Sequence, residues 1–152
     1  MTDPKMNVIM LLLISVICII VIAALIAVIL RIKRRSGIDG LDGSEFERYC
    51  ADALENAGFT HVRTTPASRD FGADVLAQKD GVTYAVQCKR YDRPVGVSSV
   101  QEVYAARDFY GMMVGAVMTN SEFTAPARQM AEKLGILLWD GQVIKKRFSQ
   151  YR

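Results

Sequence analysis

A continuous apolar run near the start of the chain constrains the fold more than any other feature. Residues 8–30 (VIMLLLISVICIIVIAALIAVIL) contain no charged side chain, and Ser15 is the one polar residue among them. As an α-helix, a run of this length rises about 35 Å, which exceeds the roughly 30 Å hydrocarbon thickness of a bilayer. The sequence therefore predicts one transmembrane helix over residues 8–30, preceded by a short extracytoplasmic segment, residues 1–7.

A basic cluster, RIKRR at residues 31–35, follows the apolar run directly. A cleaved signal peptide has its basic residues before the apolar region, so this order indicates an anchor that is retained. Basic residues gather on the cytoplasmic side of membrane spans. We therefore expect a single-pass protein of the inner (cytoplasmic) membrane, with its C-terminal domain in the cytoplasm.

The charge of the chain is unevenly distributed. The formal net charge is +3, but residues 1–35 hold five basic residues against one acidic, which leaves 14 basic and 15 acidic residues in the remainder. Any nucleic-acid binding by that remainder must then come from a local patch or a bound metal ion rather than from a general positive field. The three cysteines are too few and too scattered to indicate a disulfide framework or a zinc site.

The rest of the chain is long enough for one core. Residues 31–43 are expected to form a basic juxtamembrane segment and a glycine-rich linker, and residues 44–152 one domain. Ser44 is the expected N-cap of the first helix, with Glu47 completing a capping box. Hydrophobic periodicity and turn residues predict a helix over 44–58, strands over 61–65, 74–79 and 82–89, a helix capped by Ser98 over 98–111, a strand over 112–120, a helix over 123–135 and a strand over 136–140. This order predicts an α/β fold, a mixed β-sheet flanked by helices, and leaves residues 143–148 unassigned.

The strand over residues 82–89 ends in an unusual way. Side chains alternate across a strand, so Gln87 and Lys89 share one face, whereas Val86 and Cys88 share the other. Burying an unpaired polar group costs about 2–7 kcal/mol, so polar groups on a buried strand need a reason. The tight turn at residues 79–81 brings Asp74 back beside Gln87. A carboxylate, an amide oxygen and an ammonium group then meet at one sheet edge, as in a metal site that hydrolyses phosphodiesters.

Four motifs in this order resemble the Mrr-like restriction endonucleases of the PD-(D/E)xK nuclease superfamily. They are GSEFERY at 43–49, SRDFGADV at 68–75, VQCKRY at 86–91 and AVMTNSEFTAPARQMA at 116–131. The resemblance covers residues 43–141. It implies a restriction-endonuclease-like fold with an αβββαβ core, and it implies that Gln occupies the position where the wider superfamily has an acidic residue.

The resemblance also implies roles for individual residues. Asp74 would be the central metal ligand, Gln87 a second ligand through its side-chain oxygen, and the Cys88 carbonyl a third. Lys89 would orient or deprotonate the attacking water and stabilise developing charge. Glu47 would hold the metal through water or a second ion. The implied cofactor is Mg²⁺, with Mn²⁺ as an alternative.

Three arginines, Arg90, Arg93 and Arg107, are candidate contacts for DNA phosphates. Each proposed role has a structural alternative: Glu47 can serve as a capping residue, Lys89 can extend past the sheet edge into solvent, and the arginines can be ordinary surface charges.

The resulting hypothesis is a membrane-anchored, Mg²⁺-dependent DNA endonuclease that acts in restriction or defence against foreign DNA. Two alternatives stay open: a cleavage-deficient nucleic-acid binding domain tethered to the membrane, and a membrane scaffold protein. Cutting both strands of a duplex usually needs two sites, so a homodimer is the expected assembly. The sequence contains no recognisable module for reading a target sequence.

Overall fold

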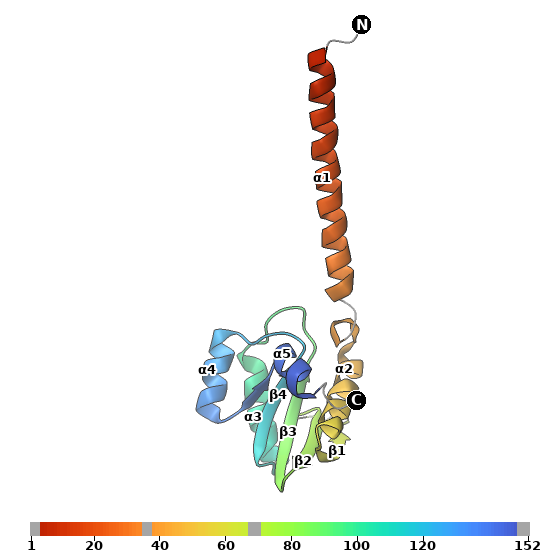
Figure 1. The fold of residues 1–152 in the computed structure, drawn as a ribbon. Helices are drawn as coiled ribbons and strands as arrows, with labels where there is room; N and C mark the ends of the chain where they lie inside the picture. Colours follow the sequence, from red (N-terminus) through yellow and green to blue (C-terminus); the bar gives the residue numbers. More distant parts are fainter. Residues whose placement is uncertain (1–3, 35–37, 67–70, 149–152) are drawn as a thin grey trace. The chain divides into compact units, whose positions relative to one another are not determined.

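The computed structural model describes residues 4–34, 38–66 and 71–148, and the chain divides into two compact units, Met1–Gly37 and Ile38–Arg152 (Figure 1). The first unit consists of helix α1, Pro4–Arg34, whose large apolar side chains are exposed wherever they are described, at Met10 and over residues 13–29. Among the residues with described side chains, no helix is both long enough and apolar enough to cross a membrane. The side chains of the basic cluster at 31–35 lie outside the described part.

The second unit is built on a five-stranded mixed sheet in the order β1-β2-β3-β4-β5 (Figure 1). The strands β1, β2 and β3 are antiparallel neighbours, whereas β3, β4 and β5 are parallel. The predicted mixed sheet is therefore confirmed. The strand bounds are Thr60–Thr64 for β1, Val75–Lys79 for β2, Val82–Lys89 for β3, Val114–Thr119 for β4 and Leu137–Trp139 for β5.

Helices cover both faces of the sheet, as expected. On one face, α2 (Gly43–Asn56) and the C-terminal segment pack against Val86 and Cys88 of β3. On the other face, α3 (Val97–Phe109) and α4 (Ala125–Leu134) pack against Ala85. The segment that the sequence left unassigned forms a short helix, α5 (Gly141–Val143), and a π-helical turn, η2 (Ile144–Phe148), because Ile144 and Phe148 are buried in the first of these cores.

Helix α2 begins earlier than predicted, and the prediction of Ser44 as its N-cap is wrong. Asp42 is the N-cap: its Oδ1 accepts a hydrogen bond from the Glu45 backbone N–H at 2.8 Å, and Glu45 Oε2 accepts one from the Asp42 N–H at 2.9 Å. Asp caps a helix as well as Ser does, and the Asp42–Glu45 spacing forms a capping box two residues earlier. Glu47 therefore has no part in the cap.

The start of α3 also differs, because its N-cap is Gly96 and no side chain caps the helix, so the predicted capping role of Ser98 is wrong. Val95, just before this cap, is bridged to Phe123 and fully buried, which fixes where the chain turns into the helix.

The hairpin between β2 and β3 sets the register of the polar strand end. Asp80 and Gly81 both have positive φ angles, 52° and 79°, as the tightest two-residue hairpin turns require. Lys79 then pairs with Val82, and the ladder continues to Val75 and Val86. The ladder ends at this pair, and Asp74 lies just before β2 with its backbone N–H donating to the Val86 carbonyl at 2.9 Å. The hairpin thus brings the Asp74 side chain within hydrogen-bond distance of the Gln87 side chain.

Candidate active site

Asp74 and Gln87 form a buried polar pair where β2 begins. Their side chains are only 6% and 3% exposed. Asp74 Oδ2 accepts a hydrogen bond from Gln87 Nε2 at 2.5 Å. Gln87 Oε1 is buried and has no hydrogen-bond partner among the residues that the structure describes. An unsatisfied buried acceptor costs about 1–3 kcal/mol, so this amide oxygen does not stabilise the fold and is open to a ligand.

The backbone of Cys88 completes this arrangement. Its N–H donates a second hydrogen bond to Asp74 Oδ2, at 2.6 Å. The N–H and C=O of one strand residue point to the same edge, so the Cys88 carbonyl also points toward the Asp74 side. The β2–β3 ladder ends at the pair Val75–Val86, before Cys88 is reached. The carbonyl oxygen thus lies beyond the last ladder pair, on the side where Asp74 lies.

The Cys88 thiol is on the opposite face, within the core beneath α2. A hydrogen bond with Cys50, burial, and the negative charges of Asp74 and Glu47 all raise the pKa of the Cys88 thiol well above its usual value. The thiol is therefore neutral and structural, and only the Cys88 backbone belongs to the candidate site.

Lys89 lies on the same face of β3 as Gln87, at the end of the strand. Its Nζ is 2.9 Å from Glu102 Oε2 on α3. Burial lowers the pKa of Lys89, but the hydrogen bond and charge of Glu102, together with the charges of Asp74 and Tyr91, outweigh it, so the pKa is raised overall. Lys89 is therefore a protonated ammonium group at neutral pH, and it does not simply extend into solvent.

Glu47 lies on α2, on the other side of β3 from Lys89. Since it takes no part in the helix cap, the capping alternative no longer accounts for it. Its side chain is half-buried, and its charge contributes to the raised pKa of the Cys88 thiol. Glu47 is therefore close to the strand end, on the α2 side.

The residues present suit a hard cation held by few carboxylates. Among the described residues, no group of three His, Cys, Asp or Glu side chains gathers closely enough to hold a metal ion. Mg²⁺, however, commonly uses one or two protein carboxylates, takes amide and backbone oxygens, and keeps several waters. The carboxylate of Asp74 beside the unpaired oxygen of Gln87 fits that donor set, whereas it does not fit zinc.

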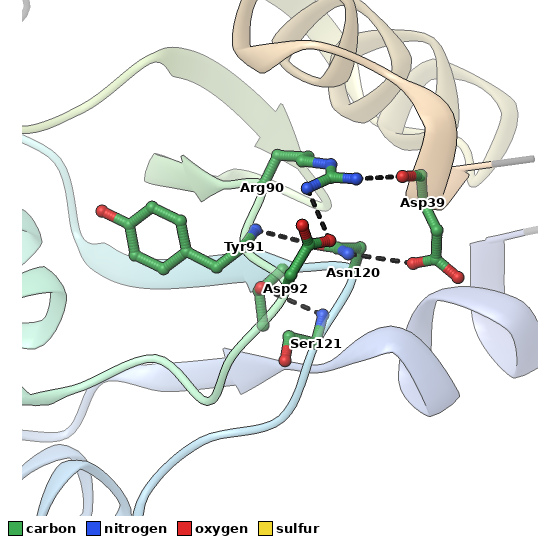
Figure 2. A network of polar contacts seen from close by, with 7 residues as sticks. Asp39, Arg90, Tyr91, Asp92, Asn120 and Ser121 are labelled. Carbon is green, nitrogen blue, oxygen red and sulfur yellow. Dashed lines mark hydrogen bonds and ion pairs between the residues drawn. The ribbon is translucent and has the colours of Figure 1, made fainter. Parts of the chain in front are cut away.

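Arg90 is placed in a polar network rather than on an open surface (Figure 2). Its Nη1 donates to Asp92 Oδ1 at 2.7 Å, and its Nη2 donates to the backbone carbonyl of Asp39. Asn120 joins the same network, because its Nδ2 donates to Asp39 Oδ1 at 2.9 Å and its Oδ1 accepts from the Tyr91 N–H at 2.9 Å. The network ties the segment η1 (Ile38–Gly40) to the ends of β3 and β4.

The other two candidate arginines are partly engaged by neighbours. Arg93 is exposed, and its guanidinium lies 5.8 Å from the centre of the Tyr91 ring. Arg107 pairs with Asp108 at 3.0 Å and lies 4.6 Å from the centre of the Tyr104 ring. Of the three arginines, Arg93 is the one that has no carboxylate partner among the described residues, and it is the most exposed to a phosphate.

Sequence reasoning missed Glu102, Asp39 and Asn120. Glu102 gives no local signal, because only the packing of α3 against β3 brings it to Lys89. Asp39 falls in a glycine-rich stretch that indicated a linker, yet the neighbouring Ile38 and Leu41 pack on the core below α2. Asn120, directly after a buried strand, was the one recoverable signal, since polar residues at the ends of parallel strands often converge. Residues 68–70 of the SRDFGADV motif lie outside the described residues.

Comparison with known proteins addresses the second unit. Residues 38–148 match the Mrr_cat family, described as restriction endonuclease. A crystal structure described as AF1548, a protein of unknown function, is 24% identical, with a TM-score of 0.56 over 66% of this chain and 63% of that one. The DNA modification-dependent restriction endonuclease AspBHI is also 24% identical, with a TM-score of 0.51 over 65% of this chain and 29% of that one.

These two likenesses show a shared fold, and the chain spans less than two thirds of either structure. No curated protein matches the chain. The family match covers most of the chain and the whole of the five-stranded sheet with its polar strand end. The chain therefore belongs to the Mrr_cat restriction endonuclease family.

Proposed function

We propose that this protein is a membrane-tethered, Mg²⁺-dependent endonuclease that hydrolyses phosphodiester bonds in DNA. The observation that carries the proposal is the buried Gln87 amide, whose Nε2 donates to the Asp74 carboxylate while its Oε1 has no partner among the described residues. A fold that needed this strand end only for stability would place an apolar residue at position 87, as it does at Ala85 and Val86. Membership of a restriction endonuclease family supplies the reaction class.

In this proposal Asp74, the Gln87 side-chain oxygen and the Cys88 carbonyl hold the ion, and Glu47 supports it from the α2 side. When bound, Mg²⁺ supplies positive charge that activates water and polarises the phosphate. Mn²⁺ is the expected substitute, since it accepts the same oxygen ligands.

Lys89 acts on the substrate as a cation. Because the pKa of Lys89 is raised, its ammonium group is protonated at neutral pH and is poorly suited to take a proton from water. A protonated Lys89 suits two of the roles considered for it, stabilising charge on the attacked phosphate and orienting the water, and deprotonation of the water stays the third.

A second candidate, DNA binding without cleavage, is favoured by one observation. Asp74 Oδ2 already accepts two hydrogen bonds, from Gln87 and from the Cys88 backbone, and Gln87 adds no negative charge. A site with one carboxylate in this state binds Mg²⁺ more weakly than a site with two. Cleavage would then be slow while the fold and DNA binding persisted.

The experiment that separates the two candidates is nicking of supercoiled plasmid by the full-length protein. Cleavage should require added MgCl₂, stop with a chelator and be about 10²–10³-fold slower in Asp74→Asn. Asn is preferred to Ala, because Ala would leave the buried Gln87 and Cys88 N–H donors without an acceptor. DNA retention in a filter assay without nicking would favour the binding module. If the protein neither retains nor nicks DNA, both candidates are contradicted.

The membrane tether rests on the uncharged run at residues 8–30 and the basic cluster that follows. We expect the full-length protein to sediment with membranes and to resist alkaline extraction, with the nuclease domain protected from external protease on the cytoplasmic side. A protein lacking residues 1–35 should remain in the supernatant. Recovery of the full-length protein in the supernatant would contradict the membrane tether without affecting the nuclease proposal. We further propose a homodimer, which sedimentation of the detergent-solubilised protein would test.

A further inference from the structure

Lys89 is held by a carboxylate from a different element of the fold. Glu102 on α3 places Oε2 2.9 Å from Lys89 Nζ, and the Glu102 side chain is 43% exposed. An ion pair that is open to solvent contributes little to stability. Stabilisation of the fold therefore does not explain the Lys89–Glu102 ion pair.

A second contact fixes Glu102 against the loop that leads to Asp74. Gly72 has a φ angle of +89°, and a Cβ atom at this position would lie 2.6 Å from the Glu102 carbonyl oxygen and 2.9 Å from its carbonyl carbon. No side chain fits there without displacing the backbone of one segment. The backbone of Glu102 thus lies directly against the loop, two residues before Asp74.

We propose that Glu102 is a positioning residue for the cleavage reaction, which holds the Lys89 ammonium on the face of β3 that carries Asp74 and Gln87. The inference rests on the nuclease function proposed above. A lysine side chain has four flexible carbon–carbon bonds, and an unrestrained ammonium group occupies many positions. Holding a reacting group in one geometry is worth orders of magnitude in rate, and a misplacement of 1 Å can cost about 100-fold.

The contact at Gly72 joins the loop that carries Asp74 to the helix that carries Glu102. Asp74 is placed by its loop and by β3, while Glu102 is placed by α3 and by the same loop at Gly72. The position of the Lys89 ammonium relative to the Asp74 carboxylate then depends on an ion pair anchored in the backbone at both of its ends, and not on the lysine side chain alone. Glu102 acts through Lys89 and is not itself expected to touch metal or DNA.

Cleavage kinetics of full-length Glu102→Ala test the proposal. With supercoiled plasmid and MgCl₂, kcat should fall about tenfold, whereas KM for DNA and the Mg²⁺ concentration at half-maximal rate should each stay within about twofold of the original protein. Glu102→Gln keeps an oxygen acceptor at the same reach and should recover most of the lost rate. Glu132→Ala, an exposed carboxylate on α4, is the matched control and should change nothing.

A wild-type kcat in Glu102→Ala, or a loss confined to KM, would overturn the positioning role. If the unaltered protein does not nick plasmid, the nuclease proposal fails, and a second measurement still decides the role of Glu102. Carbon relaxation of the lysine ε-methylene groups, with Lys89 assigned through Lys89→Arg, should show restricted motion of Lys89 in the unaltered protein and free motion in Glu102→Ala. Equal mobility of Lys89 in both proteins would overturn the inference.

Discussion

Two polar clusters lie at the same end of β3 and differ in what they leave unpaired. The first, the Asp74 cluster, comprises Asp74, Gln87 and Lys89. The second, the Arg90 network, comprises Arg90, Asp39 and Asn120 (Figure 2). In the Asp74 cluster the buried atom without a partner is an oxygen, Gln87 Oε1, whereas in the Arg90 network it is a nitrogen, Arg90 Nε.

This difference distinguishes a candidate cation site from a hydrogen-bond network that holds segments of the fold together. An oxygen acceptor beside a carboxylate can take a cation, but a guanidinium nitrogen carries a proton and cannot. The Arg90 network instead joins segments that are 51 and 81 residues apart in sequence. Adjacent residues of one motif, VQCKRY, therefore differ in their surroundings: residues up to Lys89 lie in the Asp74 cluster, and Arg90 lies in the network that joins distant segments.

The largest expected effect comes from removing charge in the Asp74 cluster. Lys89→Ala removes a cation that would stabilise transition-state charge, and Asp74→Asn removes the carboxylate that would hold the metal ion. Each should lower kcat for plasmid nicking by about 10²–10³-fold. Both proteins should retain the circular dichroism spectrum of the original. Wild-type nicking by both folded variants would remove the site assignment.

Changing the neutral member of the cluster should act on metal affinity. Gln87→Glu replaces the amide that donates to Asp74 with a second carboxylate, so repulsion should raise the carboxylate pKa values and destabilise the metal-free fold. Added Mg²⁺ should then be needed at about tenfold lower concentration for half-maximal cleavage, and it should raise the melting temperature more than in the original protein. An unchanged Mg²⁺ requirement in both Gln87→Glu and Gln87→Ala would show that Gln87 is not a ligand.

Breaking the Arg90 network should affect stability and leave the chemistry intact. Arg90→Ala removes donors to Asp39 and Asp92 and should lower the free energy of unfolding by about 1–3 kcal/mol. The exposed Arg93→Ala is the matched control, with a change within about 0.5 kcal/mol. A folded Arg90→Ala protein whose kcat fell as far as that of Lys89→Ala would abolish the distinction between the clusters.

The smallest effect concerns Cys88, whose backbone serves the site while its thiol serves the core. The pKa of the thiol is raised in the folded protein, so its contribution to stability is complete below the unfolded value, near 9, and is lost as pH rises toward the folded value. Between pH 8 and 10, urea unfolding of the original protein should lose about 1 kcal/mol more than that of Cys88→Ala. Equal losses in the two proteins would mean that the thiol is not buried as described.

Local patterns predicted most of the second unit, because its strands and helices alternate with clear turn residues. The two-residue turn at Asp80 and Gly81 alone brings Asp74 beside Gln87. The predicted caps at Ser44 and Ser98 were wrong because a nearby Asp42 competes for one helix start and a buried Val95 fixes the other. The Asp42–Glu45 capping box was itself a local signal, whereas the burial of Val95 depends on tertiary packing, which a local pattern does not contain.

The candidate site was predictable only in part, for the same reason. Asp74, Gln87 and Lys89 follow from strand alternation and hairpin geometry. The pairing of Lys89 with Glu102 depends on how α3 packs, and the capture of Arg90 by Asp39 joins a segment that its glycines marked as a linker. The orientation of the Gln87 amide, with its oxygen unpaired, is likewise a property of the packed structure.

Direct binding of Mn²⁺ tests the central claim that the Asp74 cluster holds a divalent cation. Electron paramagnetic resonance of free Mn²⁺, titrated into the full-length protein without DNA, measures this independently of cleavage. The account predicts one ion per chain, displaced by Mg²⁺, with affinity lost in Asp74→Asn, weakened in Gln87→Ala and unchanged in Arg90→Ala. Binding that survives in Asp74→Asn, or that is lost equally in Arg90→Ala, would contradict it.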